Sequence, residues 1–242
     1  MKLVIVRHGE PDYSIDSLTE KGWREAELLK HRLAKLEDPV FYCSPLGRAK
    51  DTAKPTLDFL KKEAEICDWL REFDGHGIHP ETGKKAYLWD LLPAHWATKE
   101  GYYDRFRWLE TENMQSGNVR ERYTWVCAGV DALLKKHGYR HAKNGNLYFA
   151  ERSNHETVVL FCHFGVECII LSHLLGISPI ILLHSLFAAP SAVTTLVTEE
   201  REEGIASFRC NAFGDISHLY AADEPPAFSG RFCETFDDEE RH

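Results

Sequence analysis

Short apolar runs alternate with stretches of helical periodicity in this sequence, and the alternation constrains the fold more than any other feature. Residues 2–6, 40–43 and 157–162 are apolar runs rich in β-branched and aromatic side chains, as is typical of buried strands. Residues 19–36 instead carry apolar side chains every three or four positions, which places them on one helix face. The alternation predicts a three-layer α/β/α fold with a mostly parallel central sheet and helices on both faces.

Further elements follow from local signals. Thr19 is a candidate N-cap for the first helix, and Ser44 before Pro45 predicts the cap of a second helix running through Lys62. Arg48 would then lie in the opening turn of that second helix. Residues 166–175 predict another helix, and residues 191–197 and 205–211 predict an antiparallel hairpin at the sheet edge.

Composition indicates an ordinary globular protein of 242 residues, with 43% hydrophobic and 28% charged residues. The net charge of −9 argues against nucleic-acid binding, which uses basic patches. Many acidic residues gather in residues 223–242, which predicts a solvated and weakly ordered tail. The seven cysteines form no CxxC pair, and the opening apolar run is too short for a secretory signal or a membrane span, so we expect a cytoplasmic protein with reduced thiols and no membrane partner.

Polar residues follow three of the expected strands. Arg7 and His8 come after the first strand, Ser44 and Arg48 follow the second, and His163 ends the apolar strand at 157–162. Because ligands bind outside the carboxyl ends of parallel strands, these side chains are expected to converge there. Two arginines and two histidines would form a pocket for a dianionic group, since guanidinium forks match phosphate oxygens.

The joint pattern resembles the histidine phosphatase superfamily, also called phosphoglycerate mutase-like, from residue 2 to about residue 219. A closing segment from Cys210-Asn211 through Ser217-His218-Leu219 resembles the family's last strand and turn, and five earlier segments also match: Leu3-Val4-Ile5-Val6-Arg7-His8-Gly9-Glu10, Leu18-Thr19-Glu20-Lys21-Gly22, Ser44-Pro45-Leu46-Gly47-Arg48, Leu70-Arg71-Glu72-Phe73 and Cys162-His163-Phe164-Gly165. They are similar to its opening motif, next helix entry, second-arginine element, general-acid segment and second-histidine segment.

The resemblance implies that His8 attacks phosphorus and becomes phosphohistidine, which water then hydrolyses. Arg7, Arg48 and His163 would hold the phosphate oxygens in place of a metal. The backbone amides of Phe164 and Gly165 would add donors at a helix start. No metal and no other cofactor is expected.

Glu72 is implied as the acid that protonates the leaving group and the base that activates water, which requires a raised pKa. Glu65, Asp74 and Glu81 lie nearby in the sequence and stay open as alternatives. After the opening motif, Tyr13 and Ser14 stand where many family members have an asparagine close by, so they are candidates for a substrate contact. His163 is followed by Phe164 rather than aspartate, unlike the acid phosphatase and phytase branch.

The expected organisation is one domain over residues 1–222, with a helical, aromatic insertion at about 73–156 above the active site, followed by the acidic tail 223–242. Aromatic residues at helical spacing usually pack a subdomain. Trp89, Trp96 and Tyr102 are candidates to line the pocket.

We therefore expect a metal-independent phosphatase that hydrolyses a small-molecule phosphomonoester. A phosphoglycerate mutase-type phosphotransferase and a non-catalytic protein that binds a phosphorylated ligand are the alternatives. A metalloenzyme is the rival from another class, because His137 and His141 have an i, i+4 spacing and histidines 76, 79 and 155 lie in the same half. The HExxH pattern is absent, which argues against a zinc protease. Neither the substrate nor the oligomeric state can be named from the sequence.

Overall fold

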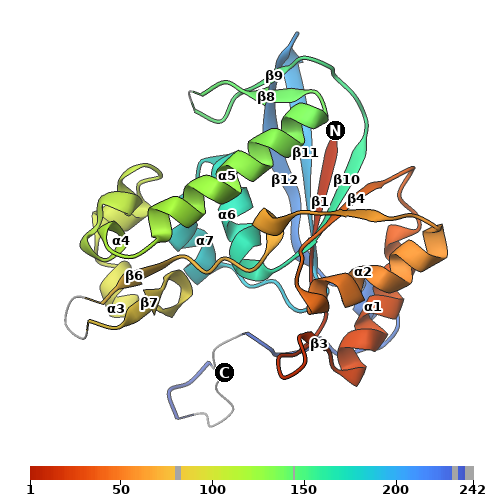
Figure 1. Cartoon of the computed structure of the whole chain (residues 1–242), viewed down its shortest axis with the longest axis horizontal. Helices are drawn as coiled ribbons and strands as arrows, with labels where there is room; N and C mark the ends of the chain where they lie inside the picture. The colour runs from red at the N-terminus through yellow and green to blue at the C-terminus, as the bar shows by residue number, and fades with distance from the viewer. Residues whose placement is uncertain (80–82, 144, 231–233, 238–242) are drawn as a thin grey trace.

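The computed structural model describes the whole chain except residues 80–82, 144, 231–233 and 238–242. An eight-stranded sheet forms its middle layer, in the order β5-β4-β10-β1-β11-β12-β9-β8 (Figure 1). The strands are β1 (Lys2–Arg7), β4 (Val40–Cys43), β5 (Ala64–Ile66), β8 (Tyr139–His141), β9 (Tyr148–Ala150), β10 (Thr157–Cys162), β11 (Val193–Glu202) and β12 (Ile205–Asp215).

The sheet is mixed. Strands β5, β4, β10 and β1 pair in parallel, whereas β1 with β11 and all later neighbours pair antiparallel. The expected α/β class is confirmed. The predicted hairpin forms as β11 and β12, but β9 and β8 extend the sheet beyond it, because their short connection allows an antiparallel pair.

Helices cover both faces of the sheet, as predicted (Figure 1). Val4 and Val6 of β1 pack with residues of α1 (Glu20–Leu33) and α2 (Gly47–Leu60). Leu3 and Ile5 point to the opposite face, into the larger core that contains α5 (Val119–Lys136) and α6 (Phe164–Leu175). The alternation of side chains along a strand thus divides β1 between two cores.

Of the two helix caps predicted from the sequence, one forms in the structure. Thr19 caps α1 as predicted, its hydroxyl accepting from the Gly22 amide at 3.0 Å. The prediction that Ser44 caps α2 is wrong, because α2 begins at Gly47 and the Gly47 amide donates to the carboxylate of Asp16 at 2.7 Å. Arg48 does lie in the opening turn.

The segment between residues 73 and 156 contributes short elements and the long helix α5. Two short strands of this segment pair with each other, and residues 80–82 between them lie outside the described residues. Its further elements are β6 (His76–Ile78), β7 (Lys85–Tyr87), α3 (Pro93–Trp96), α4 (Glu112–Gln115) and the 3-10 turns η2 (Leu88–Asp90), η3 (Glu100–Tyr103) and η4 (Arg107–Glu110). Elsewhere lie β2 (Pro11–Asp12), β3 (Ser17–Leu18), η1 (Asp68–Leu70), α7 (Pro179–Ser185) and α8 (Ser217–Tyr220).

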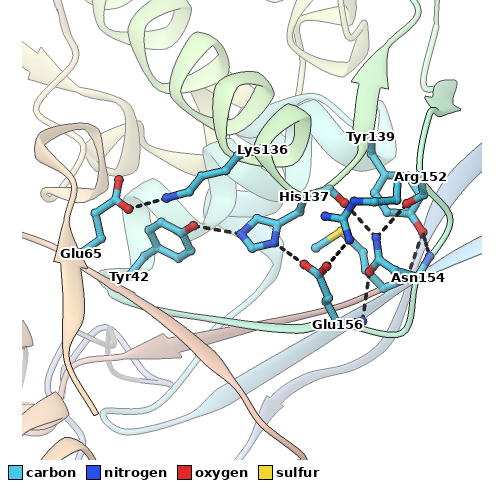
Figure 2. Close-up of polar contacts among 9 residues, drawn as sticks. Tyr42, Glu65, Lys136, His137, Tyr139, Arg152, Asn154 and Glu156 are labelled. Carbon is cyan, nitrogen blue, oxygen red and sulfur yellow. Dashed lines mark hydrogen bonds and ion pairs between the residues drawn. The ribbon is translucent and has the colours of Figure 1, made fainter.

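A polar network ties the end of α5 to the sheet (Figure 2). The buried His137 ring lies between the Tyr42 hydroxyl at 2.9 Å and the Glu156 carboxylate at 2.6 Å, and Arg152 also bonds Glu156. Both ring nitrogens of His137 are therefore engaged in fixing the fold. None of the helices in the described part of the chain has the length and apolar character that crossing a membrane requires.

Candidate active site

The carboxyl ends of β1, β4 and β10 bring the predicted residues together. Arg7 pairs with Cys162 in the parallel register, so His8 and His163 are the next residues on neighbouring strands. The His8 amide donates to the Cys162 carbonyl, and the His8 carbonyl accepts from the Ser191 amide, both at 3.0 Å. The His8 backbone is therefore fixed on both sides, and its ring lies 5.1 Å from that of His163.

The tautomer of His8 is set by its own turn. Nδ1 lies 2.7 Å from the Gly9 carbonyl, which can only accept, so Nδ1 carries the proton and Nε2 has a free electron pair. Burial lowers the pKa of His8 well below its ordinary value, and the charges of Arg7 and Arg48 lower it further. His8 is thus neutral at physiological pH, as a nucleophile must be.

Arg7 is held among aromatic rings and carbonyls. Its guanidinium lies 5.9 Å from the ring centres of Phe164 and of Phe187. It donates to the carbonyls of Ala188 and of Ser229, the latter at 3.2 Å. Arg7 is 4% exposed, so a charge that would be costly to bury alone is stabilised by fixed dipoles and ring faces.

Arg48 is oriented by an acid that the sequence analysis did not single out. Its Nη1 donates to Asp16 at 2.6 Å, and its guanidinium lies 5.4 Å from the ring of Tyr13. Burial acts to raise the pKa of Asp16, but the hydrogen bonds from Gly47 and Arg48 prevail and lower it. A Cβ on Gly47 would come within 2.0 Å of the Asp16 carbonyl, so this approach requires glycine.

Three buried donors of the site make no hydrogen bond within the described part of the chain: Arg7 Nε, Arg48 Nε and His163 Nδ1. His163 Nε2 contacts the Ser44 hydroxyl at 2.8 Å, so Ser44 orients this ring. Burial, then the neighbouring His8 and the arginines, lower the pKa of His163 well below its ordinary value. Unpaired donors from three strand ends are what an oxyanion requires.

Glu72 lies beside the first turn of α6. One oxygen, Oε1, accepts the amides of Phe73 at 2.8 Å and Val166 at 3.1 Å. These bonds and the arginine charges favour the carboxylate, but burial outweighs them and raises the pKa of Glu72. A Cβ on Gly165 would lie 2.6 Å from Glu72 Oε1, so Gly165 permits the contact.

A cavity of about 590 Å³ opens at this edge of the sheet. Arg7, Arg48, Glu72, Phe164 and Gly165 all line it. His8 and His163, which are 1% and 0% exposed, are not among its lining residues. The other lining residues are mostly apolar or aromatic: Tyr13, Trp89, Asp90, Leu183, His184, Leu186, Phe187 and Gly230. A larger cleft of about 970 Å³ is lined by Met1, Thr157 and Thr198, at the opposite edge of the sheet, away from the predicted residues.

Two of the three aromatic predictions for the cavity are wrong. Trp89 lines it, but Trp96 stacks on His184 at 5.1 Å, and Tyr102 is fully buried beside His95. Tyr102 lies in the apolar core and the partly buried Trp96 packs against it, because aromatic residues at helical spacing supply packing area. Of the loop candidates, Tyr13 reaches the cavity and Ser14 bonds Asp12 instead.

The alternatives to Glu72 lie elsewhere. Glu65 bonds Lys136, and Asp74 bonds Arg122, both away from the cavity lining. Glu81 lies outside the described residues. The two histidines that suggested a metalloenzyme contact different partners. His137 bonds Tyr42 and Glu156, whereas His141 faces Asp131.

Two buried carboxyl groups support the site and had no signal in the sequence. Glu25 of α1 accepts the Glu10 amide at 2.8 Å, and burial raises its pKa to about 7. Glu167 of α6 is 1% exposed, and burial raises its pKa to about 7 as well, with Arg7 close enough to oppose the shift. From the sequence alone, each would be taken for an ordinary exposed glutamate on a helix.

The sequence matches a family model and is similar to two curated proteins. The family model described as histidine phosphatase superfamily (branch 1) matches residues 3–211. A 2,3-bisphosphoglycerate-dependent phosphoglycerate mutase of Thermoplasma acidophilum is 33% identical over 93 residues, 34% of this chain and 45% of that protein. A probable phosphatase of Schizosaccharomyces pombe is 36% identical over 83 residues, 30% of this chain and 39% of the relative. The matched stretch thus spans less than half of each curated relative.

A solved structure shares the fold over nearly its whole length. The phosphoserine phosphatase of Entamoeba histolytica, in complex with phosphoserine, is 19% identical, with a TM-score of 0.56. The alignment covers 90% of this chain and 98% of that one.

Proposed function

We propose, from the premise that this chain belongs to the histidine phosphatase superfamily, that it is a phosphatase hydrolysing a small-molecule phosphomonoester through phosphohistidine on His8. The tautomer of His8 carries this proposal: the Gly9 carbonyl holds the proton on Nδ1 and leaves Nε2 as the nucleophile. The proposed domain is residues 1–222 with the insertion 73–156, followed by the acidic tail 223–242.

In the first step Nε2 of His8 forms a bond to phosphorus while the bond to the leaving oxygen breaks. Glu72 gives its proton to that oxygen, which the raised pKa permits. Arg7, Arg48 and His163 stabilise the charge on the transferred phosphoryl group, with the amides of Phe164 and Gly165 at the start of α6 as further donors. Guanidinium groups thus take the part of a metal ion, and the reaction needs no cofactor.

In the second step water attacks phosphohistidine. Glu72, now a carboxylate, removes a proton from the water, and the His8–phosphorus bond breaks, which releases phosphate and restores the neutral ring. The proton that left Glu72 in the first step is thereby returned.

The cavity favours hydrolysis over mutase chemistry. Among its described lining residues the permanent cations are Arg7 and Arg48, both assigned to the transferred phosphate, and burial lowers the pKa of His184. A bisphosphorylated substrate would require a second cationic subsite. The apolar lining instead suits a substrate with a hydrophobic body.

Replacing His8 with alanine tests the proposal. With a panel of phosphomonoesters, H8A should lose phosphoenzyme formation and reduce kcat/KM by about 10³-fold or more. The exposed His31 gives the control H31A, which should act as wild type. Absence of phosphoenzyme and of turnover in wild type would favour a binding protein, and label transfer to a phosphorylated acceptor rather than water would favour a mutase.

We also propose a cytoplasmic location, supported by the six described cysteines, all of which are free thiols. Cell fractionation tests this location, and recovery of the chain outside the cytoplasm would contradict it.

A further inference from the structure

Away from the cavity, three elements bring a second group of ligand-type side chains together. Asp131 lies on α5, His141 ends β8, and His173 lies in the last turn of α6. The Asp131 carboxylate is 2.7 Å from His173 Nε2 and 3.4 Å from His141 Nδ1. One ligand atom from each residue lies within 4.8 Å of the other two, so the three are close enough to bind a single cation.

The hydrogen bond of His141 shows which of its ring nitrogens carries a proton. Its Nε2 lies 3.1 Å from the Gly145 carbonyl, which can only accept, so Nε2 carries the proton. Its other ring nitrogen, Nδ1, faces the Asp131 carboxylate at 3.4 Å. A cation between this nitrogen and the carboxylate would bind both, whereas without a cation a proton bridges such a pair. A metal-binding histidine typically donates its other N–H to a carbonyl in this way.

Two further residues border the group. Cys127 lies one turn before Asp131 on the same face of α5, and its thiol is within hydrogen-bonding reach of His173. Tyr148 stacks on the His141 ring at 5.0 Å, and its fully buried hydroxyl has no hydrogen-bond partner among the described residues. The side chains of His141, His173 and Asp131 are 19%, 11% and 35% exposed, so an ion can enter from solvent.

We propose that Asp131, His141 and His173 form a zinc site, with Nδ1 of His141, Nε2 of His173 and one Asp131 oxygen as ligands. Two imidazoles and a carboxylate suit Zn²⁺, and Cys127 or water supplies the fourth ligand. The i, i+4 spacing of His137 and His141 does not reveal this site, because two of its ligands come from helices far apart in the sequence.

The proposed zinc joins α5, β8 and α6 and takes no part in phosphoryl transfer. His173 lies nine residues after Phe164 along α6, about 14 Å at 1.5 Å per residue, so the ion is remote from His8. The inference is therefore independent of the proposed function. Binding should stabilise the folded chain and leave turnover unchanged.

Calorimetric titration of the chelator-treated full chain with Zn²⁺ is the direct test. We expect one ion per chain and a rise in Tm of several degrees. H141Q and the double variant D131N/H173Q should weaken Kd at least about tenfold. H31Q is the matched control, and it should bind as wild type. Because H141Q alters a partly exposed side chain and leaves the buried core intact, it keeps the test valid if the double variant unfolds.

Substitution with Co²⁺ identifies the ligands. A four-coordinate Co²⁺ spectrum that H141Q abolishes supports the site, and a thiolate charge-transfer band that C127S removes assigns the fourth ligand. The proposal is overturned if no stoichiometric ion binds, if H31Q weakens binding as much as H141Q, or if removal of zinc from folded protein abolishes turnover. Failure of the phosphatase assay alone would leave the zinc measurements standing.

Discussion

At the scale of the residue, the two roles proposed for Glu72 require opposite charge states. The proposal requires the acid form to assist the leaving group and the carboxylate to activate water, and Oε1 can accept the amides of Phe73 and Val166 in either form. Its raised pKa brings both forms within reach. E72Q keeps the size of the side chain but cannot exchange a proton, so kcat should fall about 10²- to 10⁴-fold with an alkyl phosphate.

The dependence on the leaving group checks this assignment. The first step of E72Q should fall much less with an aryl phosphate, whose phenolate leaves without a proton, and phosphoenzyme should then accumulate. In wild type, activity should fall as pH rises through the pKa of Glu72, because the acid form is lost. D74N alters the neighbouring carboxylate that bonds Arg122 and serves as control. If the rate of the first step fell equally with the alkyl and the aryl phosphate, Glu72 would not act as the acid.

Glu167 predicts a pH dependence of stability. Its pKa is about 7 in the folded chain against an ordinary value of 4.5, so between these values the unfolded carboxyl ionises while the buried one stays protonated. The free energy of unfolding therefore falls as pH rises from 4.5 to 7, by up to about 3 kcal/mol. E167Q cannot ionise, and at pH 8 it should be more stable than wild type by about 1–3 kcal/mol.

Urea unfolding at pH 5 and pH 8 measures this difference. The advantage of E167Q should fall below about 1 kcal/mol at pH 5, because this pH lies only slightly above the ordinary pKa of 4.5. E27Q replaces a glutamate on the surface of α1, 56% exposed, and should show no such dependence. An E167Q variant less stable than wild type at pH 8 would indicate that the carboxylate is stabilised by Arg7.

At the scale of the element, the first turn of α6 joins the proposed acid to the proposed phosphate donors. Gly165 has no side chain, and this allows Glu72 to accept the Val166 amide. G165A would bring a methyl group within 2.6 Å of Glu72 Oε1 and displace the carboxyl. We expect kcat to fall at least about tenfold, because misplacement of an acid by about 1 Å is costly.

G101A is a remote control, since a Cβ there meets only the Thr111 methyl at 3.0 Å. Circular dichroism and Tm should show that both variants fold. If G165A retained full kcat, the close contact between Gly165 and Glu72 would have no part in turnover.

The starts of α1 and α2 show when a helix cap can be predicted from the sequence. The cap of α1 was predictable because Thr19 acts within its own segment, whereas the cap of α2 was not, because Asp16 comes from another loop. Ser44 has the residue type of a cap, yet its hydroxyl contacts His163 from β10. Local propensity is overridden where tertiary contacts offer a better partner.

At the scale of the whole molecule, the three layers were predictable because periodicity reports which face is buried. The positions of His8, Arg48 and His163 followed from strand ends meeting at one edge of the sheet. The antiparallel half was harder to predict, because β8 and β9 have three residues each and too little pattern to assign. The buried carboxyls were hidden, because burial of a single glutamate has no sequence signature.

The start of the tail is better ordered than its acidic composition predicts. Glu224 pairs with Lys21 at 2.9 Å and Arg24 at 3.2 Å, and Ser229 accepts from Arg7. Gly230 lines the cavity. Residues 238–242, which hold most of the acidic run at the chain end, lie outside the described residues. Ser229 and Gly230 of the tail therefore contribute to the wall of the site.

A chain that ends at Ala222 tests what this wall does. Every helix and strand among the described residues lies before that residue, and the Glu224 ion pairs are partly exposed, so the truncated chain should fold with a Tm lowered by a few degrees. Removal of the Ser229 carbonyl frees one Arg7 donor for an anion. Inhibition by inorganic phosphate or vanadate should therefore strengthen several-fold, measured as Ki.

The variant E224Q weakens the ion pairs that hold the tail but keeps the Ser229 carbonyl. Its Ki for phosphate should therefore lie between those of wild type and the truncated chain. If truncation instead weakened phosphate binding tenfold, residues 223–242 would contribute donors to the anion rather than compete for Arg7. The two results have opposite signs because a carbonyl can accept from Arg7 but cannot donate to phosphate.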